Sequence, residues 1–137
     1  RMRVKNMGEI SKNLKIVIIV NVVAALVYGI LQTFFTEAYL MMVEQPTPDV
    51  HFTRVGGGTL LVLVIFGIYS VLKKSWDEFK LLYEFVIVYL IMLLILDIVY
   101  FATFTISATN FTNTLIATIL TAVLIVVDIF FYLKEQK

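Results

Sequence analysis

The sequence predicts an all-α integral membrane protein with four transmembrane helices in an antiparallel up-down bundle. First, it contains four apolar runs of about the length, roughly 20 residues, that a helix needs to cross a bilayer. Second, the chain is 61% hydrophobic and only 15% charged, whereas soluble domains are roughly 45–50% apolar and about 25% charged. Third, nearly all lysines and arginines lie in alternate connections between the runs, as expected of a multi-pass protein.

Each predicted span begins where polar or charged residues give way to apolar ones and ends where they return. The third span carries a carboxylate, Asp97, well inside its apolar run. The whole chain of 137 residues is expected to form a single membrane domain. The predicted spans are residues 14–35, 55–72, 81–104 and 114–133.

Three connections join these spans. The first, residues 36–54, contains Pro46 and Pro48, whose neighbours prefer extended conformations. We therefore expect an external loop there rather than more helix. Residues 73–80 are predicted to form a charged cytoplasmic turn, and residues 105–113 a second external loop without charge.

The basic residues orient the chain in the membrane. Of the eleven lysines and arginines, ten lie in residues 1–15, 73–80 and 134–137, and the remaining one is Arg54. Positive residues concentrate on the cytoplasmic side of multi-pass proteins. We therefore expect a protein of the cell membrane, surrounded by the lipid bilayer, with both termini in the cytoplasm.

Several functional classes find no support in the sequence. The absence of cysteine excludes disulfides, thiolate nucleophiles and Cys-ligated metals. A net charge of +1 provides no general attraction for nucleic acid. The one histidine, His51, lies near Asp49 and Glu44 without a metal-ligand spacing. We predict no metal site, no cofactor, no catalytic residues and no enzymatic activity.

Small and polar residues mark helix contacts in lipid, because the hydrophobic effect does not drive helices together there. The first two spans each carry such residues along one helical face. One interpretation is that these stripes are only packing seams; the other is that they line a functional site. The stripes comprise Asn21, Ala25, Tyr28 and Gln32 in the first span and Gly56, Thr59, Leu63, Gly67 and Ser70 in the second.

Depth divides the polar residues into two layers, of which the outer one surrounds Asp97. At about 1.5 Å per residue, Asp97 and Gln32 both lie roughly 24 Å from their cytoplasmic ends. Asp97 is expected either to bind a cation, a proton or a ligand's positive group, or to be structural. A structural Asp97 would be protonated or paired with Arg54, with Tyr100 or Gln32 as hydrogen-bond partners. The predicted outer pocket comprises Asp97, Gln32, Tyr28, Thr59, Tyr100, Thr118 and Arg54.

The inner layer lies nearer the cytoplasmic edge. Asp128, about 9 Å from that edge, is expected to be a solvated or paired carboxylate close to Lys134. Asp97 and Asp128 therefore lie at opposite depths and are not expected to form a dyad. The inner layer comprises Asn21, Asp128, Ser70 and Tyr83.

Two other polar residues have simple explanations. Glu84 is expected in the first turn of the third helix, where a negative charge suits the helix dipole. Asn110-Phe111-Thr112 is a glycosylation sequon, but it lies almost at the membrane surface, so we do not expect it to be used.

One segment, PTPDVHFTRVGGGTLLVLVIFG, combines a Pro-bearing connection with a span that opens on Arg and Gly. With the apolar run before it, this arrangement resembles the DoxX-like small four-helix membrane proteins, over residues 14–75. The matching residues are Pro46, Arg54, Gly57 and Gly67. The resemblance implies a four-helix membrane fold. Members of the family are often uncharacterised, and some are membrane subunits of redox systems, so the resemblance implies little about function.

Together these features predict a small polytopic membrane protein without catalytic activity of its own. It is expected to act as a binding or accessory subunit in an oligomer or a larger membrane complex. Self-association or another membrane subunit is expected because four helices bury little surface. The alternative is a small transporter or channel with a polar outer pocket centred on Asp97.

Overall fold

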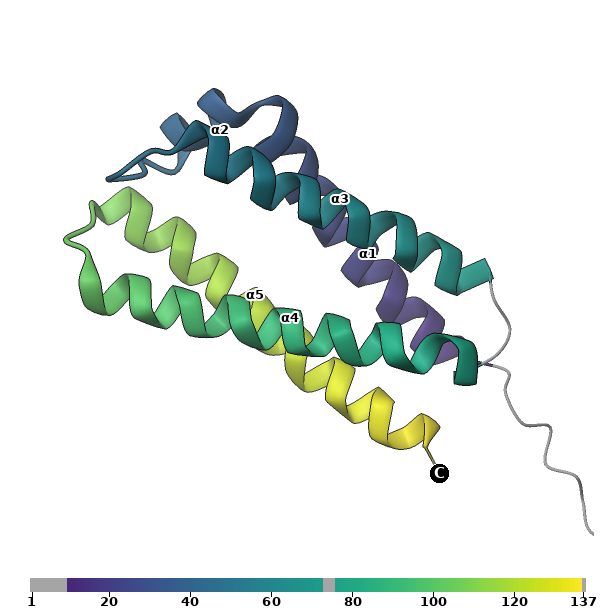
Figure 1. Cartoon of the computed structure of the whole chain (residues 1–137). Helices are drawn as coiled ribbons and strands as arrows, with labels where there is room; N and C mark the ends of the chain where they lie inside the picture. The colour runs from purple at the N-terminus through teal and green to yellow at the C-terminus, as the bar shows by residue number, and fades with distance from the viewer. Residues whose placement is uncertain (1–9, 73–75, 137) are drawn as a thin grey trace, which may run out of the picture.

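The computed structural model describes residues 10–72 and 76–136, and within these ranges the chain is helical, with no strand (Figure 1). A short helix, α2 (Thr36–Met42), follows the first long one. The predicted all-α class with four membrane-length helices is confirmed. The helices that are long and apolar enough to cross a membrane are α1 (Lys12–Phe34), α3 (Val50–Leu72), α4 (Trp76–Thr103) and α5 (Ala108–Glu135).

Side-chain caps determine where three of these helices begin. The Ser11 hydroxyl oxygen accepts a hydrogen bond from the Leu14 backbone N–H at the start of α1 (3.2 Å). The Ser107 hydroxyl oxygen accepts a hydrogen bond from the Asn110 backbone N–H at the start of α5 (3.1 Å). Asp49 precedes α3, and its carboxylate accepts the Phe52 N–H (2.8 Å). Each cap satisfies a backbone donor that has no partner within the helix.

These caps explain why the predicted connections are too long. The prediction of a loop over residues 36–54 is wrong at both ends, because α2 occupies Thr36–Met42 and α3 begins at Val50. The loop is confined to residues 43–49, around the two prolines. Hydropathy marks the apolar part of a span, whereas a cap marks the helix end, and here the caps lie outside the apolar run.

The other two connections also differ from prediction. The expected loop at residues 105–113 shrinks to residues 104–107, because Ser107 already caps α5. In the expected turn at residues 73–80, residues 76–80 belong to α4, and residues 73–75 lie outside the described residues.

The long helices associate as two pairs. α1 packs against α3, α4 packs against α5, and successive long helices alternate in direction (Figure 1). Contact between the pairs is much sparser than contact within them. The fold is therefore two closely packed helical hairpins that touch each other over a limited area.

Glycines allow the close approach of α1 and α3. A Cβ atom at Gly57 would lie 2.5 Å from the Thr33 hydroxyl oxygen and 2.8 Å from the Thr33 backbone nitrogen. A Cβ at Gly29 would lie 2.9 Å from Cδ2 of Leu61. Small residues let two backbones pack closely in lipid, where packing rather than the hydrophobic effect holds helices together.

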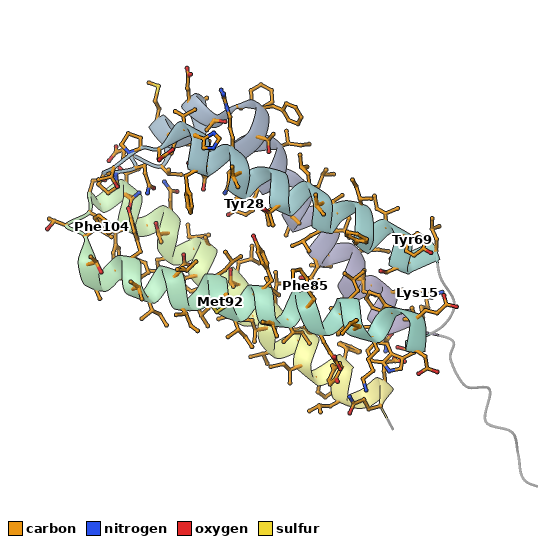
Figure 2. The ribbon with its side chains drawn as sticks, in the orientation of Figure 1. Lys15, Tyr28, Tyr69, Phe85, Met92 and Phe104 are labelled. Atoms are coloured by element: carbon orange, nitrogen blue, oxygen red, sulfur yellow. The ribbon has the colours of Figure 1, made fainter. Side chains whose placement is uncertain are left out.

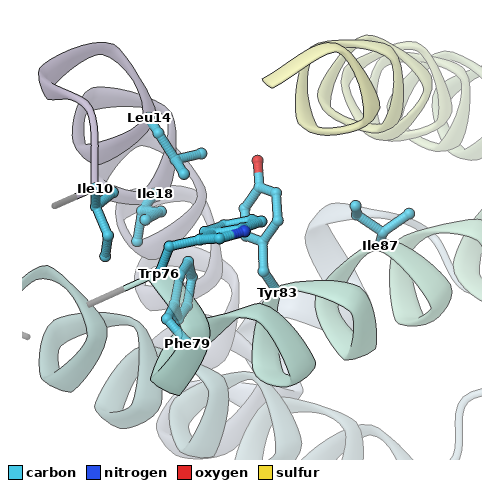
Figure 3. Packing of buried hydrophobic residues seen from close by; sticks show 7 residues of the cluster. All are labelled: Ile10, Leu14, Ile18, Trp76, Phe79, Tyr83 and Ile87. Carbon is cyan, nitrogen blue, oxygen red and sulfur yellow. The ribbon is translucent and has the colours of Figure 1, made fainter. Parts of the chain in front are cut away.

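An aromatic cluster joins the two pairs at one end (Figure 3). The Trp76 ring centroid lies 6.0 Å from that of Phe79 and 5.9 Å from that of Tyr83. Val71 of α3 and Tyr132 of α5 pack against the cluster, so all four long helices contribute. Its buried members are Ile10, Leu14, Ile18, Trp76, Phe79, Tyr83 and Ile87.

Large apolar side chains cover the outer faces of the helices. Phe85 and Met92 of α4 are 53% and 50% exposed (Figure 2). Lipid tails are as apolar as these side chains, so such exposure has no hydrophobic penalty in a bilayer.

The glycine seam generates a stability prediction. Gly57→Ala should destabilise the fold by about 1–3 kcal/mol, because the new methyl group overlaps the Thr33 backbone. Gly58→Ala is the control, since its Cβ meets no atom within 4 Å. The free energy of unfolding of both variants is measured by titration with sodium dodecyl sulfate, with far-ultraviolet circular dichroism as the signal. Equal stability of the two variants would contradict the proposed close packing at Gly57.

Candidate functional site

A cavity of about 460 Å³ lies between the two helix pairs. Residues of all four long helices line it, together with Tyr39 and Leu40 of α2. Tyr28 projects into the space between the pairs (Figure 2). Most of the lining is apolar, with a few polar groups, and the volume falls within the range of about 300–1,000 Å³ typical of small-molecule sites.

Polar residues from both predicted layers line this one cavity. Asp97, Gln32 and Tyr28 come from the outer layer, and Asn21 and Tyr83 from the inner layer. All four residues of the stripe on the first span line the cavity, as the functional interpretation of that stripe requires. Its helical spacing places these side chains on one face of α1.

Asp97 has one hydrogen-bond partner within the described ranges. Oγ1 of Thr118 donates to Oδ2 of Asp97 (2.8 Å), across the contact between α4 and α5. The structure does not form the pair expected between Asp97 and Arg54. Arg54 instead donates from Nε to the Thr36 hydroxyl (3.2 Å), which in turn donates to the Gln32 carbonyl.

Four residues of the predicted outer pocket lie outside the cavity lining: Thr59, Tyr100, Thr118 and Arg54. The Thr59 hydroxyl donates to the Val55 carbonyl of its own helix (3.0 Å), the usual alternative for a helical Thr. Tyr100 donates to Oδ1 of Asn110 (2.8 Å) rather than to Asp97. Helical spacing alone did not show whether these side chains bond to nearby groups or face the cavity.

Tyr39 is a cavity residue that sequence reasoning missed, because residues 36–54 were predicted to be a loop. Nε2 of Gln32 lies 3.4 Å from the Tyr39 hydroxyl and donates to it. Burial raises the pKa of Tyr39, the hydrogen bond from Gln32 lowers it, and the nearby Tyr28 and Asp97 raise it further. The sequence did contain a signal for α2, because the residues before the prolines, TEAYLMM, include several good helix formers.

Asp128 is the centre of a buried network: of the two expected states, a solvated carboxylate is contradicted by its burial, and its hydrogen-bond partners are Asn21 and Tyr83 of the same predicted layer rather than Lys134. Asp128 is 0% exposed. Nδ2 of Asn21 donates to both carboxylate oxygens (2.9 and 3.0 Å), and the Tyr83 hydroxyl donates to Oδ1 (2.7 Å). The Tyr83 hydroxyl points toward α5 in Figure 3. These bonds connect α1, α4 and α5.

Ser70 and Glu84 lie outside the Asp128 network, and the predicted position of Glu84 needs correction. The Ser70 hydroxyl donates to the Phe66 carbonyl (2.6 Å) rather than to Asp128. Glu84 lies two turns inside α4, because that helix begins at Trp76 rather than near residue 81. Its carboxylate accepts a hydrogen bond from Tyr132, which links α4 to α5.

The two carboxylates belong to separate networks, as their depths predicted. Thr118, the partner of Asp97, precedes Asp128 by ten residues of α5, which corresponds to about 15 Å along the helix. In residues 10–72 and 76–136 no group of three or more His, Cys, Asp or Glu could hold a metal ion.

Asn110 links the loop after α2 to the start of α5. It is 1% exposed, and its Nδ2 donates to the Val43 carbonyl (2.6 Å) while Oδ1 accepts from Tyr100. A buried, doubly bonded amide is a poor glycan acceptor, consistent with the expectation that the sequon is not used. The sequence contained no sign of this second connection between the helix pairs.

Comparison of the chain with protein-family models, with curated proteins and with solved structures finds no match. The resemblance to DoxX-like proteins therefore stays a prediction. The interpretation of the site depends on its geometry.

The Asp128 network predicts a measurable loss of stability when one hydroxyl is removed. Tyr83→Phe should destabilise the protein by about 0.5–2 kcal/mol, because it removes a buried hydrogen bond to a carboxylate. Tyr28→Phe is the matched control, since the Tyr28 hydroxyl makes no hydrogen bond in the described part of the chain. Detergent-induced unfolding compares them; an equal effect of the two substitutions would argue against the network.

Proposed function

We propose that this chain is a small membrane-embedded binding protein without catalytic activity of its own. It works as a binding or accessory subunit in an oligomer or a larger membrane complex. The observation that carries the proposal is the cavity of about 460 Å³ between the helix pairs, lined by all four long helices. A mostly apolar cavity with a few polar groups is the usual form of a small-molecule site.

The sparse contact between the pairs supports ligand binding, because it leaves the space between them that forms the cavity. Each pair is held by its own seam, whereas the pairs meet through the aromatic cluster and the Asp128 network at one end. At the other end Asn110 bonds to the Val43 carbonyl. Side-chain contacts thus connect the pairs at both ends of the helices, and the cavity lies between the pairs.

The outer faces support association within the membrane. They are covered by large apolar side chains, such as Phe85 and Met92 of α4. Such faces are compatible with lipid and equally with helices of a second copy or another membrane subunit.

The alternative function, a transporter or channel centred on Asp97, uses the same cavity. A channel requires a continuous path, whereas here the aromatic cluster and the Asn21–Asp128–Tyr83 bonds close one end. A transporter would have to break these contacts in a second conformation. The geometry therefore favours binding over conduction.

A cavity-filling substitution tests the binding proposal. Ala117 lines the cavity, so Ala117→Phe should reduce the occupancy of ligands that co-purify from native membranes. Native mass spectrometry in mild detergent measures the bound mass and also reports self-association or a second subunit. Ala102→Phe is the control, because Ala102 is exposed and outside the cavity lining. A ligand-free parent protein, or equal ligand occupancy in both variants, would refute the proposed site.

We further propose that both ends of the chain are cytoplasmic in the cell membrane. Of the eleven basic residues, only Arg54 lies on the opposite side in this arrangement. Residues 104–107, which join α4 to α5, are then external.

Cysteine labelling tests this topology directly, because the chain has no cysteine of its own. A membrane-impermeant maleimide should label Thr105→Cys in intact cells but label Gln136→Cys only after permeabilisation. Both sites lie outside regular helix, so local structure does not block the reagent. The reverse pattern would invert the proposed orientation, and labelling of both in intact cells would exclude a shared topology.

A further inference from the structure

The charge distribution in the cavity is one-sided. Among the described residues that line it, Asp97 is the only charged side chain, and none is Lys, Arg or His. Arg54 lies outside the lining and donates to Thr36. A ligand within the cavity therefore meets one carboxyl group and no compensating positive charge.

Asp97 also has an unused acceptor. Thr118 donates to Oδ2, while Oδ1 has no hydrogen-bond partner in the described ranges. The carboxyl group is partly exposed and lines the cavity, in contrast to the fully enclosed Asp128. Ionisable groups at membrane depth normally have a partner, because an isolated charge is costly there. Oδ1 of Asp97 is therefore available to a positive group of a ligand in the cavity.

The surrounding wall suits the rest of such a ligand. Tyr28, Tyr39 and Tyr89 contribute aromatic rings, and their faces attract cations. Tyr39 and Asp97 line the same cavity. The remaining wall is dominated by aliphatic and phenyl side chains, including Leu60, Leu63 and Phe66. This surface would accommodate an apolar body attached to the charged group.

We propose that the cavity binds an amphipathic organic cation, with its positive group beside Asp97 and its apolar body between the helix pairs. This inference rests on the proposed binding function and names its ligand class. A phospholipid is disfavoured, because its phosphate would find no basic side chain among the described lining residues. The ligand is thus a lipophilic monocation rather than a zwitterionic lipid.

The test uses two ions of similar shape and opposite charge, tetraphenylphosphonium and tetraphenylborate. Equilibrium dialysis against the full chain in dodecyl maltoside measures the affinity for each ion, after the binding to protein-free micelles is subtracted. The parent protein should bind the cation at least about tenfold more tightly than the anion, because the Asp97 carboxylate attracts a positive charge and repels a negative one. This comparison requires no substitution and so does not depend on the folding of a variant.

Substitutions then locate the charge preference. Asp97→Asn should weaken cation binding at least about tenfold, whereas Asp97→Glu, which keeps the charge, should retain most of it. Asp77→Asn is the control, because Asp77 is exposed at the start of α4 and outside the cavity lining. Circular dichroism confirms that each variant is folded.

The outcomes distinguish this inference from the binding function itself. Equal affinity for the two ions, no binding of either, or full cation binding by Asp97→Asn overturns the cation proposal. If Ala117→Phe still displaces the co-purifying ligand, the binding function stands with a different ligand class. If Ala117→Phe leaves ligand occupancy unchanged, the cavity site fails as well.

Discussion

The fold depends on a buried carboxylate shared by three helices. Asp128 of α5 accepts hydrogen bonds from Asn21 of α1 and Tyr83 of α4, and it has no exposure. A carboxyl group at that position is tolerable in a membrane only if its oxygens have donors. Because the donors come from both helix pairs, satisfying Asp128 also holds the pairs together. The aromatic rings around Tyr83 enclose the same junction and exclude solvent from it.

The cavity follows from the difference between contacts within and between the pairs. Glycines bring α1 and α3 into close contact, and α4 and α5 pack as a hairpin. Within the described residues, α3 and α4 make much sparser contact with each other than α1 with α3 or α4 with α5, and the cavity lies between the pairs. The two intramembrane acids consequently differ in role. Asp128 is enclosed and accepts hydrogen bonds from Asn21 and Tyr83, whereas Asp97 lines the cavity and accepts one hydrogen bond, from Thr118, within the described residues.

Sequence reasoning identified several site residues because the helical repeat is a local property. Asn21, Tyr28 and Gln32 share one face of α1 by spacing alone, and all three line the cavity. Thr59, Arg54 and Ser70 share a suitable face or depth, yet their polar groups bond to nearby backbone or to Thr36. Spacing does not specify which competing acceptor a hydroxyl or guanidinium will use, so the cavity lining could not be separated from these residues by spacing alone.

The four membrane-length helices can be predicted from local sequence, because each apolar run has the length and hydropathy that a helix needs to cross a bilayer. The different depths of Asp97 and Asp128 are predictable in the same way, since the rise of a helix is constant. The pairing of helices, the burial of Asp128 and the position of Tyr39 are not predictable from local sequence. These depend on which faces meet, and that is settled by close packing at glycines and by donors supplied from distant parts of the chain.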